Sequence, residues 1–103
     1  MRYVCLNPRV LDTAQKMHEY LRDALGFPAY YGMNLDALND VMTEPRGPIS
    51  ILCLRYVRAG ESVCPFADRF YRVLSDCAKE NADLRVDVIE IPATINENFD
   101  RPD

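Results

Sequence analysis

The stretch that decides the fold of this chain reads Tyr30-Tyr31-Gly32-Met33-Asn34-Leu35-Asp36-Ala37-Leu38-Asn39-Asp40. Asn34 is a favourable N-cap residue, and it separates an aromatic-glycine turn from a short helical pattern. At about 100° per residue, the side chains of Asp36, Asp40 and Glu44 fall within about 80° of one another. The opposite side of the helix is apolar and contains Leu35, Leu38, Val41 and Met42. The pattern therefore predicts a helix over about residues 35–42 that buries one stripe and presents three carboxylates.

The residues before this stretch predict a strand and a helix. Residues 3–6 are apolar and are stopped by Asn7-Pro8, as expected of a short buried strand that ends in a turn. The next helix is predicted to have Asp12 as its N-cap, with Gln15 completing a capping box, and to end at Gly26-Phe27-Pro28. Its apolar stripe consists of Ala14, Met17, Leu21, Ala24 and Leu25.

The second half of the chain predicts two further strands and one further helix. Residues 49–55 form a continuous apolar run, which is typical of a parallel strand covered on both faces. Residues 56–64 are interpreted as a loop. Pro65 starts a helix that ends near Glu80, with a stripe of Phe66, Phe70, Val73, Leu74 and Cys77. Residues 84–91 alternate apolar and charged side chains and predict a partly exposed strand.

This order of elements predicts an α/β fold with a small three-stranded parallel sheet packed with about three to four helices. The 103 residues, 49% of them hydrophobic, are enough for one compact domain without metal or disulfides. We expect that domain to cover residues 1–91 and residues 92–103 to be a mobile C-terminal tail.

Charge is distributed unevenly, although the net charge is only −4. Residues 30–44 contain three acidic residues and no basic one, so this segment disfavours direct binding to nucleic-acid phosphates, which requires Lys and Arg. A basic protein partner is the natural complement.

No catalytic, metal or targeting motif is found. Cys5, Cys53, Cys64 and Cys77 lack metal-ligand or redox spacing, and we expect reduced structural thiols, with a disulfide as the alternative. His18 has no nucleophile or carboxylate at relay spacing, so we expect no enzyme and no cofactor. The N-terminal apolar run is too short for a signal peptide and no segment is long enough to span a membrane, which predicts a cytoplasmic protein.

The motif Tyr-Tyr-Gly-x-Asn-Leu-Asp-Ala-Leu, preceded by Leu25-Gly26-Phe27-Pro28, resembles the signature of the barstar family of intracellular ribonuclease inhibitors. Weaker likeness at Met17-His18, Ala78-Lys79-Glu80 and the last strand extends the resemblance over most of residues 1–91. The resemblance implies that Asp40 enters the active-site cleft of a ribonuclease, with Asp36 beside it. It also implies a partner-binding surface made of Tyr30, Gly32, Asn34, Asp36, Asn39, Asp40, Thr43, Glu44, Asp76 and Glu80.

Several of these residues also have ordinary structural interpretations. Asp36 would be favoured in the first turn of any helix, and Gly32 could serve a turn that needs positive φ. Asp76 could pair with Arg72, one helical turn earlier. For the aromatic residues we expect Tyr31 or Phe27 to face the core and Tyr30 to face the partner.

The chain also departs from the family pattern. Asn39 stands where the family has a tryptophan beside the entering aspartate, and Glu44-Pro45-Arg46-Gly47 replaces a glycine-tryptophan pair. Because aromatic anchors dominate many interfaces, the expected partner is a ribonuclease other than barnase, with Arg46 contributing to specificity.

The leading hypothesis is an antitoxin or immunity protein that occludes a ribonuclease or ribonuclease-like toxin as a monomer in a 1:1 complex. A regulatory module that binds a basic non-nuclease protein is the alternative. A divalent-metal site at Asp36, Asp40 and Glu44 is disfavoured, because one exposed helix face encloses an ion poorly.

Overall fold

A computed structural model of the chain describes residues 1–45 and 47–93. The expectations for Arg46 and for residues 94–103 lie outside these residues. The elements in chain order are β1 (Arg2–Leu6), α1 (Ala14–Leu25), α2 (Leu35–Met42), β2 (Ile49–Arg58), β3 (Glu61–Ser62), α3 (Pro65–Glu80) and β4 (Leu84–Pro92). The predicted α/β class is thereby confirmed.

The central strand of the sheet is β2, which pairs in parallel with β1 on one side and with β4 on the other. These three strands are the predicted parallel sheet. The predicted loop over residues 56–64 is wrong, because β2 continues to Arg58 and pairs antiparallel with the short strand β3. Ala59 and Gly60 join the two strands with φ values of 53° and 81°. Two successive residues with positive φ match the twist of a hairpin, so the chain reverses instead of leaving the sheet.

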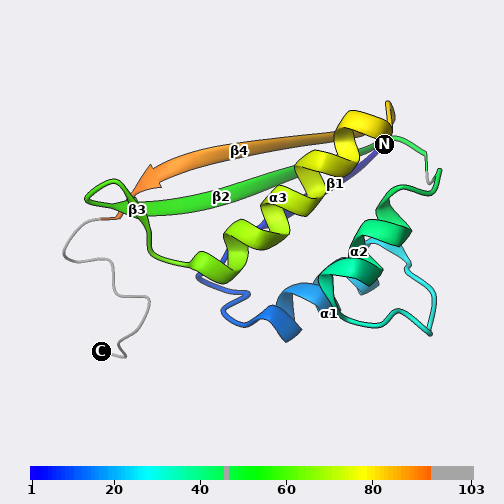
Figure 1. The fold of residues 1–103 in the computed structure, drawn as a ribbon, viewed down its shortest axis with the longest axis horizontal. Helices are drawn as coiled ribbons and strands as arrows, with labels where there is room; N and C mark the ends of the chain where they lie inside the picture. Colours follow the sequence, from blue (N-terminus) through cyan, green and yellow to red (C-terminus); the bar gives the residue numbers. More distant parts are fainter. Residues whose placement is uncertain (46, 94–103) are drawn as a thin grey trace.

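All three helices of the described chain lie on one face of the sheet (Figure 1). The sequence had predicted that β2 is covered on both faces, and this is wrong. Ile49, Ile51 and Cys53 are buried, whereas the alternate residues Ser50 and Leu52 are only partly buried. The reason is topological. Both parallel crossovers advance in the same direction across the sheet, from β1 to β2 to β4, and right-handed crossovers then place their helices on the same face.

The N-terminus of α1 is capped differently from the prediction. Its N-cap is Thr13, whose side chain accepts a hydrogen bond of 3.1 Å from the backbone N–H of Lys16. Asp12 instead pairs with Lys16 Nζ at 2.9 Å, and Gln15 bonds to Glu19, so no capping box forms. The residues of α1 that enter the core are Met17, His18, Leu21 and Leu25, while the predicted Ala14 and Ala24 are exposed.

The only histidine, His18, is buried in the core with 4% of its surface exposed. Its Nδ1 lies 2.6 Å from the hydroxyl oxygen of Tyr31, and its ring packs against Phe70 with a centroid distance of 4.5 Å. Tyr31 also packs against Phe27, at 4.9 Å between ring centroids. These contacts fix the chain segment between α1 and α2 to the core.

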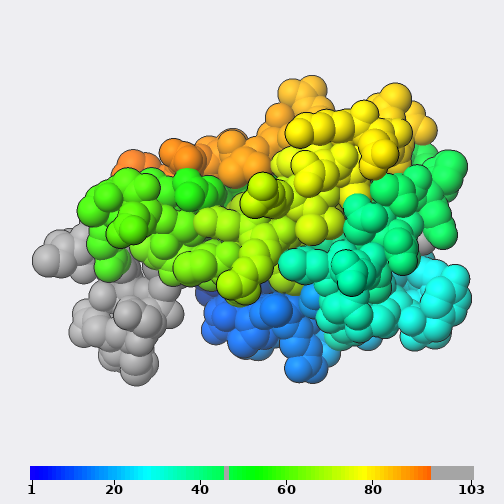
Figure 2. All heavy atoms as spheres, viewed as in Figure 1, coloured from blue at the N-terminus to red at the C-terminus, as the bar shows by residue number. Residues whose placement is uncertain are grey.

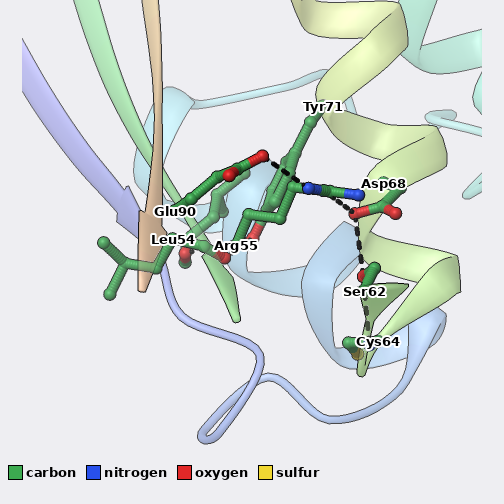
Figure 3. Close-up of polar contacts among 8 residues, drawn as sticks. Leu54, Arg55, Ser62, Cys64, Asp68, Tyr71 and Glu90 are labelled. Atoms are coloured by element: carbon green, nitrogen blue, oxygen red, sulfur yellow. Dashed lines mark hydrogen bonds and ion pairs between the residues drawn. The ribbon is translucent and has the colours of Figure 1, made fainter. Parts of the chain in front are cut away.

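The N-terminal half of α3 is joined to the sheet by polar contacts (Figure 3). Arg55 on β2 pairs with Asp68 at 3.2 Å and with Glu90 on β4 at 2.6 Å. The hydroxyl of Ser62 donates to Asp68 over 3.2 Å. Tyr71 donates to the carbonyl oxygen of Leu54 over 2.7 Å. The helix starts at Pro65, as predicted, and these contacts set its height above the sheet.

All four cysteines are free. Cys53 and Cys77 are buried, but Cys5 is exposed on the face of the sheet that the helices leave open, although it lies within a strand predicted to be buried. None of the helices in the described residues is long and apolar enough to span a bilayer.

Candidate functional site

The acidic helix α2 forms as the sequence predicts. Asn34 is its N-cap, and the Asn34 side chain accepts a hydrogen bond of 2.8 Å from the backbone N–H of Ala37. Leu38, Val41 and Met42 are buried, and Leu35 is partly buried. One face of α2 is therefore committed to the core, which fixes the direction of the other.

The outward face of α2 presents carboxylates to the solvent. Asp36, Asp40 and Glu44 are all exposed. Within residues 1–45 and 47–93, the carboxylates of Asp36 and Asp40 have neither an ion pair nor a hydrogen bond through their side chains. Both groups are consequently available to cations of another molecule without first breaking a bond within this chain.

The turn before α2 divides its two tyrosines between core and solvent. Tyr31 is 7% exposed, whereas Tyr30 is 85% exposed. This confirms the expectation that Tyr31 or Phe27 faces the core, since both are buried, and Tyr30 faces solvent. In the turn, the side chain of Tyr30 is therefore a large aromatic group free to contact a partner, next to the carboxylates of α2.

Gly32 does not serve the turn through positive φ, which was its ordinary structural interpretation. Its φ is not positive, and the left-handed residue of the turn is Met33, with a φ of 57°. A Cβ atom at position 32 would lie 3.3 Å from Asn34 Nδ2 and 3.5 Å from Ala37 Cβ. The missing side chain thus allows the turn to approach the first turn of α2 closely.

The acidic residues of α3 lie next to α2. The thiol of Cys77 on α3 donates toward Asn39 Oδ1 over 3.4 Å, so the two helices touch at this point. Burial raises the pKa of the Cys77 thiol, and the negative charges of Glu80 and Asp76 raise it further. Figure 2 shows the surface of α2 bordering the C-terminal half of α3 on the same side of the molecule. Asp76 and Glu80 therefore lie on α3 close to the residue that touches α2.

Asp76 does not pair with Arg72, which was the alternative interpretation. Its carboxylate lies 3.6 Å from Lys79 Nζ, and both side chains are more than half exposed. Exposed pairs of this kind contribute at most about 1 kcal/mol, so a cation of a partner can replace Lys79 at small cost.

Asn39 and Thr43 stabilise the end of α2 as well as being exposed. Asn39 Oδ1 accepts from Cys77, so its side chain is turned toward α3. Thr43 is the C-cap, and its hydroxyl lies 3.0 Å from the carbonyl oxygens of both Asn39 and Asp40. Asn39 and Thr43 therefore support the predicted surface through hydrogen bonds within the protein, at least as much as they offer contacts to a partner.

Sequence reasoning missed Asn81. Its Nδ2 donates to the carbonyl oxygen of Met42 over 3.3 Å, which links the end of α3 to the end of α2. An asparagine directly after a predicted helix suggests a cap of that helix. Nothing in the sequence pointed to a partner 39 residues away.

We also searched the described residues for a hollow and for a possible metal site. A hollow of about 290 Å³ lies between α3 and the sheet and is lined by Arg55, Asp68, Tyr71, Arg72, Ser75 and Val88. In the described part of the chain, no three His, Cys, Asp or Glu side chains are grouped closely enough to hold a metal ion. Asp36, Asp40 and Glu44 accordingly form no such group.

Comparison with known proteins agrees with this geometry. The model of the barstar family, described as barstar (barnase inhibitor), matches residues 1–91. A protein of Bacillus subtilis (strain 168) named "Putative ribonuclease inhibitor YrdF" is 30% identical over 91 residues, which cover 87% of this chain and 100% of that protein. The matched region contains every predicted partner-binding residue. This chain belongs to the barstar family.

Proposed function

We propose that this chain is a cytoplasmic inhibitor, acting as an antitoxin or immunity protein, that blocks the active site of a barnase-like ribonuclease or ribonuclease toxin domain. Family membership supports inhibition of a ribonuclease as the general role, and with it a binding rather than a catalytic function. The observation that carries the proposal is the Asp40 carboxylate, which is exposed and unpaired in the described chain. Its helix is capped by side chains at both ends.

The physical basis is the likeness between a carboxylate and a phosphate. A ribonuclease cleft holds a phosphodiester with Arg, Lys and His, so a carboxylate delivered at the right depth can replace phosphate oxygens without any reaction. A rigid carboxylate loses little conformational freedom on binding, which favours affinity. Charge pairs at the barnase–barstar interface couple by about 1.5–7 kcal/mol, a range taken from that complex.

The remaining acidic residues have a different role in the proposal. Asp36 lies one turn before Asp40 on α2, Glu44 follows the end of α2, and Asp76 and Glu80 lie on the adjacent helix α3. The field of these carboxylates attracts a basic cleft over several ångströms and accelerates association, while contributing less than Asp40 to the lifetime of the complex. Tyr30, Gly32 and Asn34 would lie along the groove that holds the rest of the RNA.

The missing aromatic anchor bears on the choice of enzyme. Asn39 is turned toward Cys77 and offers no large apolar contact. Since aromatic anchors contribute much of the energy of many interfaces, we propose that the partner is a ribonuclease other than barnase. Tyr30, at 85% exposure, is then the main aromatic contact of the binding surface.

The test is an RNA-cleavage assay with a panel of barnase-like ribonucleases, including barnase and any ribonuclease domain encoded beside this chain. The proposal predicts that an equal concentration of the chain stops cleavage by at least one of them, and that barnase is inhibited weakly. Tight binding that leaves cleavage intact would instead support a regulatory module with a basic partner. Failure to bind or inhibit any member of the panel would contradict the proposal.

A further inference from the structure

The C-terminal end of α2 depends on donors from outside the helix. An α-helix leaves its last four carbonyl groups without intrahelical partners, and α2 has only eight residues. Its last turn contains no basic residue. Asp40, the position that matters most for the proposed function, lies in this turn, and Glu44 comes two residues after its end. Their placement is therefore set by whatever satisfies these carbonyls.

In the described residues, Thr43 and Asn81 supply donors, and the Cys77 thiol also lies 3.8 Å from the carbonyl oxygen of Asn39. Thr43 donates its backbone N–H to the carbonyl oxygen of Asn39 over 3.1 Å, and its hydroxyl lies 3.0 Å from the carbonyl oxygen of Asp40. Asn81 donates its Nδ2 to the carbonyl oxygen of Met42 over 3.3 Å. Thr43 is local and moves with α2. Asn81 belongs to another element, so its bond fixes α2 relative to the rest of the protein.

Asn81 itself is held firmly. It is the C-cap of α3, and its backbone N–H donates to the carbonyl oxygen of Cys77 over 3.0 Å. Its Oδ1 accepts from the backbone N–H of Asp83 over 3.0 Å, and its carbonyl oxygen accepts from Leu84, the first residue of β4, over 3.1 Å. Both the nitrogen and the oxygen of the side-chain amide thus make hydrogen bonds, and the Asn81 backbone from which the side chain reaches α2 is held in place.

We propose that Asn81 is a positioning residue for ribonuclease binding, which rests on the function proposed above. Its amide fixes the C-terminal end of α2 against the C-terminal end of α3. The first of these ends contains Asp40 and is followed by Glu44, and the second contains Asp76 and Glu80. The contact between Cys77 and Asn39 joins the same two helices one turn earlier. Together these contacts make two sets of carboxylates into one rigid acidic surface.

The neutral charge of asparagine suits this role. A lysine or arginine could also donate to the carbonyl of Met42 and would interact favourably with the helix C-terminus. It would also place a positive charge among Asp40, Glu44, Asp76 and Glu80 and weaken the field that attracts a basic cleft. Asn81 supplies the hydrogen bond and leaves the field intact.

The test compares Asn81→Ala with Thr13→Ala in the full chain. Thr13 caps α1, so its replacement removes one side-chain hydrogen bond and leaves α2 untouched, whereas Asn81→Ala removes two, to Met42 and from Asp83. The first measurement is amide hydrogen exchange of the free proteins. We expect Asn81→Ala to accelerate exchange of the last amides of α2 by about three- to tenfold, the factor of one hydrogen bond, and Thr13→Ala to leave them unchanged.

The second measurement uses the ribonuclease of the panel that the wild-type chain inhibits most strongly. Asn81→Ala is expected to raise the dissociation rate by about three- to tenfold, and Thr13→Ala by less than twofold. In an Asp40→Ala background the effect of Asn81→Ala should shrink, because Asn81 acts through the placement of α2. A purely structural role would leave the dissociation rates of the two variants alike.

The outcomes separate this inference from the proposed function. Unchanged exchange in α2 overturns the role of Asn81 whether or not a ribonuclease binds. Faster exchange with an unchanged dissociation rate also overturns the proposed role of Asn81. The end of α2 would then be more mobile, but the complex would be no less stable. If the wild-type chain inhibits no ribonuclease, the proposed function fails and the binding part of the inference fails with it. The exchange experiment still decides whether Asn81 fixes α2.

Discussion

The imidazole Nδ1 of His18 on α1 lies 2.6 Å from the hydroxyl oxygen of Tyr31, inside the core. Tyr31 directly follows Tyr30, an exposed aromatic residue of the proposed binding surface. Burial raises the pKa of Tyr31 to about 12, so its hydroxyl stays protonated near neutral pH and can donate to a neutral imidazole. The contact ties the turn that carries Tyr30, Gly32 and Asn34 to the core.

Stability is predicted to fall when the pH drops below about 6.5. Burial lowers the pKa of His18 from its usual 6.5, so the folded state takes up a proton on this ring less readily than the unfolded state does. The stabilisation from neutral His18 is therefore complete above pH 6.5 and is lost as the pH falls through the unfolded pKa toward the folded one. Urea unfolding between pH 7.5 and 5 measures this loss, and it should be smaller in His18→Gln. Equal pH dependence in the two proteins would contradict it.

Removal of the hydroxyl should lower folding stability at Tyr31 and leave it almost unchanged at the neighbouring Tyr30. Tyr31→Phe leaves His18 Nδ1 buried without its partner and should cost about 1–3 kcal/mol of folding stability. Tyr30→Phe, at an exposed position, should change stability by less than about 0.5 kcal/mol. Chemical denaturation of both variants at pH 7.5 provides the comparison. Similar stability losses would mean that the bond to His18 is unimportant.

The network around Arg55 gives a second matched pair. Asp68 accepts from both Arg55 and Ser62, so Asp68→Asn should cost about 1 kcal/mol of stability. Glu90→Gln removes only the outer partner, whose side chain is 62% exposed, and should cost less than about 0.5 kcal/mol. Neither variant should change ribonuclease binding, since both residues lie away from α2. Thermal or urea unfolding distinguishes the two, and a larger loss for Glu90→Gln would show that the network is assigned wrongly.

Asp36 is predicted to act mainly on the rate of association. Asp36→Asn removes one exposed negative charge from the surface that meets the basic cleft. Association should slow at low ionic strength and differ little from wild type near 0.5 M salt, where charges are screened within about 4–5 Å. Asp87→Asn removes the same charge from β4 and is the control. Stopped-flow association rates at several salt concentrations test this, and an equal effect of both variants would contradict local steering.

Much of the fold follows from local patterns in the sequence. The apolar runs of β1 and β2, the cap at Asn34 and the proline at the start of α3 identify the elements, and the strand-helix-strand order predicts the parallel sheet. These features are decided by residues close together in the chain. The sequence also predicted that Tyr31 or Phe27 faces the core, and the structure buries both and exposes Tyr30.

The features that sequence reasoning missed depend on contacts between distant residues. The cap of α1 was predicted at Asp12 because Gln15 follows it at capping-box spacing, whereas the structure shows that the Asp12 carboxylate pairs with Lys16 and that Thr13 is the cap. The hairpin after β2 was hidden because β3 has only two residues. The link from Asn81 to Met42 requires knowing that the ends of α2 and α3 meet. Residue patterns carry no such distance information.

The proposed entry of Asp40 into the basic cleft of a ribonuclease is tested by the affinity of Asp40→Ala for the ribonuclease that the wild-type chain inhibits. The account predicts a loss of about 2–5 kcal/mol, mostly through faster dissociation, because the enzyme's cations would remain buried and unpaired. Glu61→Ala, on β3 at the opposite end of the molecule from α2 (Figure 1), should lose almost nothing. A loss below about 0.5 kcal/mol for Asp40→Ala would contradict the account, because the acidic face of α2 would then not be the binding surface.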